Sequence, residues 1–275
     1  MLNLFRYGPN KTMVRWAVRA SWPLMIAAKR LSAVPVFRTV IHPFFAAPWN
    51  EVTAVPIGHR IETGQNVVLP RRVVERLVER VPQRFILDEC ICRRQMGCQD
   101  YPQDIGCMAL GPAIAGMHPS NGRRVSGAEA VAHVQRAAAA GLIANVAHVW
   151  IDVLAFGLTP FQRLMFICFC DDCCCLYRTH MQRRGTNLNR AYQALPGIRV
   201  KVDAARCNGC GLCAQRCFVA EMKVVNGTAS PGAHCKGCGR CVEICPAGAV
   251  SLEIEDEETL YANLVSRIDA VADIW

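Results

Sequence analysis

Apolar positions recur with helical spacing in two long segments of the chain. Between residues 73 and 81, valine and leucine fall on one face of a helix that the pattern predicts to begin near Pro70 and end before Pro82. Ser126-Gly-Ala-Glu129 is a capping box, so a second helix is expected to run to about Ala140. A third apolar stripe follows Glu255 and is expected to dock on the protein itself. Its members are Leu260, Leu264, Ile268 and Val271.

Strand-like patterns lie between these helices. The segment from Arg84 to Cys92 is predicted as a strand, and its alternation would place Cys90 and Cys92 on the same side. Residues 142–149 are predicted as another strand. Glycines and prolines after residue 96 predict loops that carry Cys98 and Cys107.

Residues 1–50 form a region of distinct composition. They hold seven basic residues and no acidic residue, and tryptophans and phenylalanines lie among them. The spacing of Val14, Ala17, Val18 and Ser21 predicts an amphipathic helix that ends before Pro23. Such a segment is typical of an arm that lies on a membrane surface or docks on a partner. Packing on its own domain is the alternative.

Two runs of cysteine near the C-terminus carry the clearest chemical signal. Cys207, Cys210, Cys213 and Cys217 follow the spacing C-x2-C-x2-C-x3-C, and Cys235, Cys238, Cys241 and Cys245 repeat it before Pro246. This spacing wraps a peptide around an iron–sulfur cubane, and in two-cluster proteins the fourth cysteine of each run ligates the other cluster. One cluster would then take Cys207, Cys210, Cys213 and Cys245, and the other Cys235, Cys238, Cys241 and Cys217. Two structural zinc sites are the alternative, but three thiols at strict two-residue gaps fit zinc poorly.

Residues 203–254 resemble a bacterial dicluster ferredoxin domain. The resemblance implies two [4Fe–4S] clusters in a pseudo-twofold fold and a role in one-electron transfer. Phe218 stands where the family usually has proline after the fourth cysteine.

Nine further cysteines lie in the preceding part of the chain. They are Cys90, Cys92, Cys98, Cys107, Cys168, Cys170, Cys173, Cys174 and Cys175. Consecutive residues diverge in both strands and helices, so the last three are not expected to serve one cubane together. The count favours two clusters with Cys174 as the spare thiol, and a single cluster with several core thiols is the alternative. Zinc is also open, because thiolate-rich sites accept it.

This part of the chain resembles the N-terminal module of a family of anaerobic iron–sulfur proteins. The resemblance rests on Cys90-Ile-Cys-Arg93, Tyr101-Pro102, Gly122-Arg123 and Cys168-x-Cys-x2-Cys-Cys-Cys175. In that family the module precedes a dicluster ferredoxin domain. The resemblance implies additional metal clusters and redox work.

Composition limits the compartment and the partners. Seventeen cysteines in 275 residues stand in metal-type groups, and no secretory signal precedes them. A reducing cytoplasm is therefore expected, with the basic arm as the candidate for peripheral contact at the inner face of the membrane. The formal charge of +9 omits about two negative charges for each all-cysteine cubane, so it does not require nucleic acid.

The expected fold class is α+β, with a Cys-rich α/β N-terminal module followed by a bacterial dicluster ferredoxin-like domain. The predicted division is a basic amphipathic arm (1–50), a cluster-binding module (51–181), a linker (182–202), the ferredoxin domain (203–254) and a C-terminal helix (255–275). The favoured function is electron transfer as a subunit or docking partner of a larger anaerobic redox complex. The alternatives are a redox enzyme with a substrate-binding iron–sulfur site in the N-terminal module and, more weakly, a metal-sensing or cluster-delivery protein.

Overall fold

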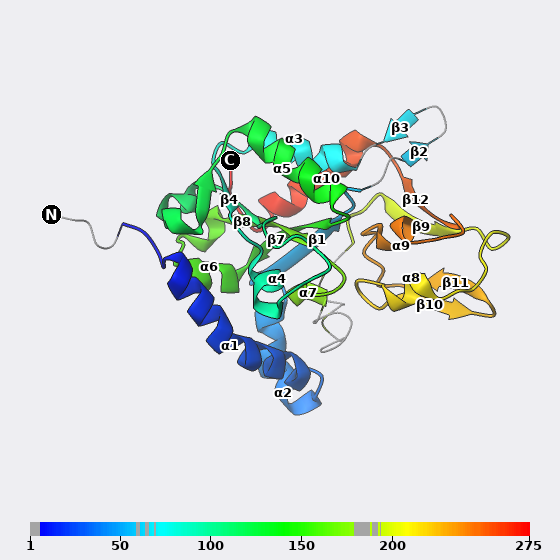
Figure 1. The fold of residues 1–275 in the computed structure, drawn as a ribbon, viewed down its shortest axis with the longest axis horizontal. Coiled ribbons are helices and arrows are strands. Elements are labelled where there is room, and N and C mark those ends of the chain that lie inside the picture. Colours follow the sequence, from blue (N-terminus) through cyan, green and yellow to red (C-terminus); the bar gives the residue numbers. More distant parts are fainter. Residues whose placement is uncertain are drawn as a thin grey trace.

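A six-stranded antiparallel sheet lies at the centre of the structure, with helices on both faces (Figure 1). The computed structural model describes residues 6–58, 61–63, 66–68, 70–178, 188, 192 and 194–275. A smaller unit of two-stranded sheets and short helices lies at one end of the central sheet (Figure 1). The mixture of helices and sheets agrees with the α+β class predicted from the sequence.

The central sheet has the strand order β1-β7-β8-β5-β4-β6. Its strands are β1 (Asn50–Val55), β4 (Arg84–Leu87), β5 (Met108–Leu110), β6 (Gly122–Arg124), β7 (Ile143–Val149) and β8 (Met165–Cys170). Every residue of β7 is buried, and Val146 lies between Thr53 of β1 and Ile167 of β8. The predicted strand at 142–149 is confirmed. Strands β2 (Ile61–Thr63) and β3 (Asn66–Val68) form a separate hairpin.

One face of the sheet is covered by helices α3 (Arg71–Arg80), α5 (Gly127–Ala139) and α10 (Glu257–Asp269). Both predicted helices are confirmed, and the capping box of Ser126 and Glu129 is present. Leu260, Leu264 and Ile268 of α10 are buried in the same core as the valines of α3, which confirms that this stripe docks on the protein itself. The C-terminal helix therefore returns to the central sheet.

The opposite face is covered by α1 (Lys11–Leu31), α4 (Ile91–Met96) and α6 (Trp150–Phe156). Helix α1 continues through Pro23, so the predicted end before that proline is wrong. The helix is held on both sides of the proline, because Val14 packs in the core beneath it and Lys29 Nζ donates to the Leu176 carbonyl at 3.1 Å. These contacts compensate for the hydrogen bond that a proline removes.

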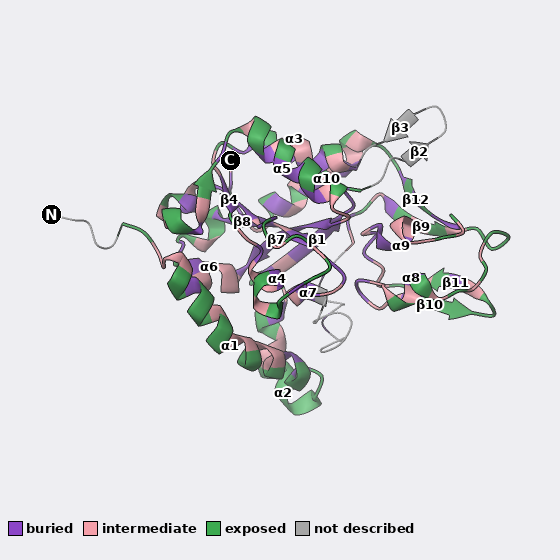
Figure 2. Ribbon diagram, in the orientation of Figure 1, coloured by how far each residue is buried: buried purple, intermediate pink, exposed green. Residues whose placement is uncertain are grey.

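Helix α2 (Pro35–Ile41) and the 3₁₀ helix η1 (His42–Phe45) complete this layer. Their outer surfaces, like that of α1, are largely exposed (Figure 2). Within the described residues, no helix combines the length and apolarity needed to cross a bilayer. Other short helices of the larger unit are η2 (Pro112–Gly116), η3 (Pro119–Asn121), η4 (Phe161–Arg163) and α7 (Leu176–Arg178).

The smaller unit contains the two cysteine runs. It is built from β9 (Ile198–Val202), α8 (Leu212–Gln215), β10 (Met222–Val225), β11 (Thr228–Pro231), α9 (Arg240–Glu243) and β12 (Val250–Ile254). The range predicted as a linker, 182–202, thus includes strand β9, while 182–187, 189–191 and 193 lie outside the described residues. Ile198, Leu252 and Ile254 join the core beneath α3 and α10, which fixes this unit against the larger one.

Candidate metal centres

Cys207, Cys210, Cys213 and Cys245 line one small cavity in the smaller unit. Gly209 and Gly211 adopt φ angles of 68° and 77°, a left-handed backbone that glycine enters readily and that turns the chain between successive cysteines. Backbone N–H groups also point at the sulfurs, since Ala229 donates to Cys207 Sγ at 3.4 Å and Ala249 to Cys245 Sγ at 3.3 Å. The fourth thiol of this set comes from the second run.

The other four cysteines of the smaller unit also influence one another. Burial raises the pKa of Cys235, Cys238 and Cys241, the last to about 12, and repulsion from Cys217 contributes in each case. Cys217 belongs to the first run, and it lies near the cysteines of the second run. Thiols whose pKa values are raised by burial and by neighbouring sulfurs suit a cationic metal centre, which favours the thiolate form.

Six cysteines of the larger unit gather on the face of the sheet that α1 covers. This inner group consists of Cys90, Cys92, Cys107, Cys168, Cys170 and Cys175, all of which line one cavity. Cys168 and Cys170 alternate along β8 with Ile167 and Phe169, which face the opposite core. The 90–107 and 168–175 segments therefore contribute thiols to one place.

The strand predicted for Arg84–Cys92 is too long. Strand β4 ends at Leu87, and helix α4 begins at Ile91 with Cys90 as its N-cap. Cys90 N–H donates to the Gln103 carbonyl at 2.7 Å, which holds the chain in a turn between the two elements. The two thiols still lie together, because Cys90 and Cys92 share a hydrogen bond across the first turn of the helix.

The pKa values of the thiols in the inner group are shifted as expected for a metal-binding set. Hydrogen bonds with Cys107 and Cys92 hold the pKa of Cys90 well below its usual value. Hydrogen bonds between thiols, together with burial, raise the pKa of Cys92 and Cys107 instead. Without a cation the site can carry few thiolates, whereas a bound metal would supply the missing positive charge. The donor set therefore fits a metal centre, with more sulfurs than one four-iron cluster needs.

The cavity beside the inner group has a volume of about 560 Å³ and mostly apolar walls. Helices α1, α2 and η1 cover one side of it, and aromatic side chains line it: Trp22, Phe44, Phe45, Trp150, Phe156, Phe166 and Tyr177. Asp152 is a carboxylate in this lining, and its buried Oδ2 has no hydrogen-bond partner among the described residues. Burial raises the pKa of Asp152 to about 7. The cavity thus combines thiols, aromatic walls and one unpaired acid.

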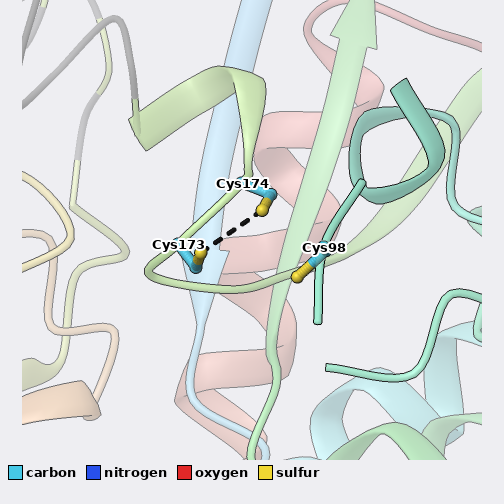
Figure 3. A group of neighbouring side chains, drawn as sticks. All are labelled: Cys98, Cys173 and Cys174. Carbon is cyan, nitrogen blue, oxygen red and sulfur yellow. Dashed lines mark hydrogen bonds between the residues drawn. The ribbon is translucent and has the colours of Figure 1, made fainter. Parts of the chain in front are cut away.

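The remaining three cysteines form an outer triad of Cys98, Cys173 and Cys174 (Figure 3). All three sulfurs lie within 4.8 Å of one another, and Cys173 and Cys174 are 3.3 Å apart. Burial, reinforced by hydrogen bonds with Cys173 and Cys98, raises the pKa of Cys174. The residue expected to be the spare thiol is therefore part of a compact group.

The loop that follows β8 joins the two units. Asp172 accepts hydrogen bonds from Arg216 at 2.6 Å, Arg240 at 2.9 Å and the Tyr101 hydroxyl at 2.7 Å, and its side chain is only 1% exposed. Arg216 and Arg240 immediately precede Cys217 and Cys241. The bridge orients the smaller unit against the inner group.

Comparison with known families gives one match. The model of the 4Fe-4S binding domain matches residues 233–251, which include Cys235, Cys238, Cys241 and Cys245. The chain is an iron–sulfur protein. Comparisons with curated proteins and with solved structures found no match. The matched domain supports an electron-transfer role.

Two features of this iron–sulfur protein were not found from its sequence. Asp152 lies in a segment without other acidic residues, and only its depth in the structure separates it from a surface carboxylate. Arg93 was noted only as part of a motif, but its side chain is fully buried and donates to Phe169 O at 2.8 Å, Ile105 O at 2.6 Å and Asp171 at 3.2 Å. Its place beside Cys92 was the available signal.

Proposed function

We propose that this protein transfers single electrons through several [4Fe–4S] clusters as a subunit or docking partner of a larger redox complex. Cys207, Cys210, Cys213 and Cys245 would hold one cluster, and Cys235, Cys238, Cys241 and Cys217 a second. Four of the six inner-group thiols would hold a third. When bound, such clusters supply one-electron redox chemistry.

One observation carries this proposal. Cys217 and Cys238 of the smaller unit pack against the same hydrophobic cluster as Cys168, Cys170 and Cys175 of the inner group. The two thiol sets thus share a wall of buried side chains. The cationic side chains of Arg216 and Arg240 lie in this region, and positive charge near a cluster favours its reduced state.

The N-terminal helices support a role in docking. On α1 and α2, Trp16, Leu24, Val36 and Val40 are each about two-thirds exposed or more. Basic residues accompany them, and a basic helix with exposed apolar side chains suits a membrane surface or a partner subunit. We place the protein in the cytoplasm, where it would contact the inner face of the membrane through this arm.

Iron analysis of matched variants tests the cluster assignment. The full chain, purified anaerobically, should contain iron and acid-labile sulfide in equal amounts. Cys210→Ser and Cys238→Ser should each remove about four irons per chain, because each breaks a different cluster. Reduced protein should show EPR of spin-coupled cubanes. Recovery of zinc without labile sulfide from the smaller unit's cysteines would contradict the proposal.

The apolar cavity favours a second candidate, a redox enzyme with its substrate site beside the inner group. Pockets that bind small molecules are typically apolar with a few polar groups, and this one offers thiols and Asp152. The matching substrate is an apolar molecule with an aromatic or quinonoid ring. It would accept two electrons from the redox partner and two protons from water.

Binding of a short-chain benzoquinone discriminates the two functions. If the enzyme proposal holds, the quinone should perturb the EPR of the reduced protein. Ala28→Trp, which fills the cavity from α1, should abolish that effect. Ala27→Trp is the matched control, because Ala27 is exposed on the same helix and outside the lining. An unperturbed EPR spectrum favours the electron-transfer protein over the redox enzyme.

A further inference from the structure

The outer triad is more compact than the other cysteine sets. Among the residues that the structure describes, Cys98, Cys173 and Cys174 are the only three His, Cys, Asp or Glu residues whose donor atoms all lie within 4.8 Å of one another. Neither the two sets of the smaller unit nor the inner group meets this limit. A tetrahedral ion with metal–sulfur bonds of about 2.3 Å holds its sulfurs about 3.8 Å apart. In a cubane each thiolate ligates a different iron, which spreads the sulfurs further.

The backbone explains how two consecutive cysteines come together. Cys173 N–H donates to Asp171 Oδ1 at 2.9 Å, and Cys174 N–H donates to the same oxygen. This turn around one carboxylate replaces the strand or helix in which neighbouring side chains would diverge. Figure 3 shows the resulting loop beside Cys98, with the two sulfurs of Cys173 and Cys174 facing each other.

Arg93 fixes both halves of the triad. Its carbonyl accepts the Cys98 N–H at 2.9 Å, where Gly97 ends α4 in a left-handed conformation. Its guanidinium donates to Asp171 at 3.2 Å, on the carboxylate that organises Cys173 and Cys174. One buried residue thus sets the distance between the two loops. Such preorganisation is typical of a metal site.

A fourth ligand is available from the same loop as Cys98. Burial raises the pKa of Cys173, and the neighbouring exposed carboxylate of Asp100 contributes to the shift. Structural zinc sites are almost always four-coordinate, and they accept carboxylate oxygen alongside thiolate sulfur. A set of three thiolates and one carboxylate also suits a divalent ion better than one thiol alone does.

We propose that Cys98, Cys173, Cys174 and Asp100 bind one zinc ion, separate from the iron–sulfur clusters. The ion would clamp the loop after α4 to the loop after β8. Because the second loop also carries Asp172, the site would hold the contact between the two units. This assignment gives Cys174 a ligand role in place of the spare thiol expected from the sequence.

Metal analysis of the full chain, purified anaerobically without chelator, tests the proposal. About one zinc per chain should accompany the iron. Zinc-edge X-ray absorption should show three sulfurs at about 2.3 Å and one oxygen at about 2.0–2.2 Å. Cys98→Ser and Cys174→Ser should lose the zinc and keep the iron, whereas Cys210→Ser should lose iron and keep the zinc. Asp100→Asn should keep three sulfur ligands and bind zinc more weakly.

Three outcomes would overturn it. They are wild-type protein with less than about one tenth of a zinc per chain, a zinc bound by fewer than three sulfurs, and loss of about four irons from the Cys174 variant. If a variant fails to fold, the absorption spectrum of the wild-type protein decides alone. Iron content reports the electron-transfer proposal and zinc content reports this one, so the two can fail separately.

Discussion

The guanidinium of Arg93 lies 3.2 Å from the carboxylate of Asp171, and their side chains are 0% and 1% exposed. The charges of this pair are withdrawn from water, and Arg93 also interacts with the thiols of Cys90 and Cys107. Arg93 also donates to the carbonyls of Phe169 and Ile105, and Asp171 accepts two backbone N–H groups. The pair therefore connects helix α4, strand β8 and the cysteine loop that follows β8.

Arg93→Ala should destabilise the protein by about 3–5 kcal/mol. The substitution leaves Asp171 buried without its countercharge, which is the costly way to break such a pair. Anaerobic guanidinium unfolding measures the effect. Arg94→Ala is the matched control on the next residue of α4, and it should cost less than about 1 kcal/mol because its side chain is 55% exposed. Equal effects of the two variants would show that the buried pair has no special weight.

Loss of the bridge at Asp172 should destabilise the protein by a similar amount. Burial opposes the charge of this carboxylate, but hydrogen bonds from Arg240 and Arg216 outweigh it and hold its pKa below the ordinary value. Asp172→Asn leaves Arg240 without that partner, so a loss of about 3–5 kcal/mol is expected. Glu253→Gln breaks the exposed pair with Lys201 and should cost about 0–1 kcal/mol. A shared unfolding midpoint for the two variants would contradict the prediction.

Local signals in the sequence were sufficient for helices α3, α5 and α10 and for β7. The capping box at Ser126 and the stripe from Leu260 to Ile268 depend on neighbours within a few residues, and both are present as predicted. Strand β4 was predicted too long because the apolar alternation continues past Leu87, whereas a backbone hydrogen bond between Cys90 and Gln103 turns the chain. Helix α1 was predicted too short because the contacts of Lys29 and Val14 are distant in sequence.

The grouping of the nine N-terminal cysteines could not be predicted from the sequence for a similar reason. Spacing predicts the two C-terminal runs because each ligand lies within a few residues of the next. The outer triad instead joins Cys98 to residues about 75 positions later, through Arg93 and Asp171. The argument that consecutive cysteines diverge holds for regular structure, and Asp171 creates a turn to which it does not apply.

Asp152 should make stability fall with rising pH. Burial raises its pKa from an ordinary 3.8 to about 7 in the folded protein. Between these values the folded protein keeps a proton that the unfolded chain has lost, so stability decreases as pH rises through this window. The accumulated loss is on the order of 4 kcal/mol, and Asp152→Asn should remove it.

The measurement is the difference in unfolding free energy between wild type and Asp152→Asn at pH 5 and at pH 8, under anaerobic conditions. The free energy of unfolding of the variant, relative to that of the wild type, should be larger at pH 8 than at pH 5. Glu79→Gln on α3 is exposed and serves as control, with the same difference at both pH values. A constant difference for Asp152→Asn would mean that the carboxylate is ionised in the folded protein throughout.

The exposed side of α1 and α2 should bind anionic lipid. Trp16 and Val36 are 74% and 79% exposed. The first fifty residues hold no acidic residue, and among their basic residues Lys11 and Arg15 pair with Asp88 and Glu89. Each basic residue near an anionic surface contributes about 1 kcal/mol, and the apolar side chains add burial in the interface. Full-length protein should therefore sediment with vesicles that contain one quarter phosphatidylserine, and less so in high salt.

Trp16→Asp with Val36→Asp should abolish sedimentation while leaving the iron content unchanged. Val225→Asp is the matched control, because Val225 is an exposed apolar residue on β10, in the smaller unit. Equal sedimentation of both variants would rule out this surface, and vesicle-free association with a redox partner through the same residues would assign the arm to protein docking.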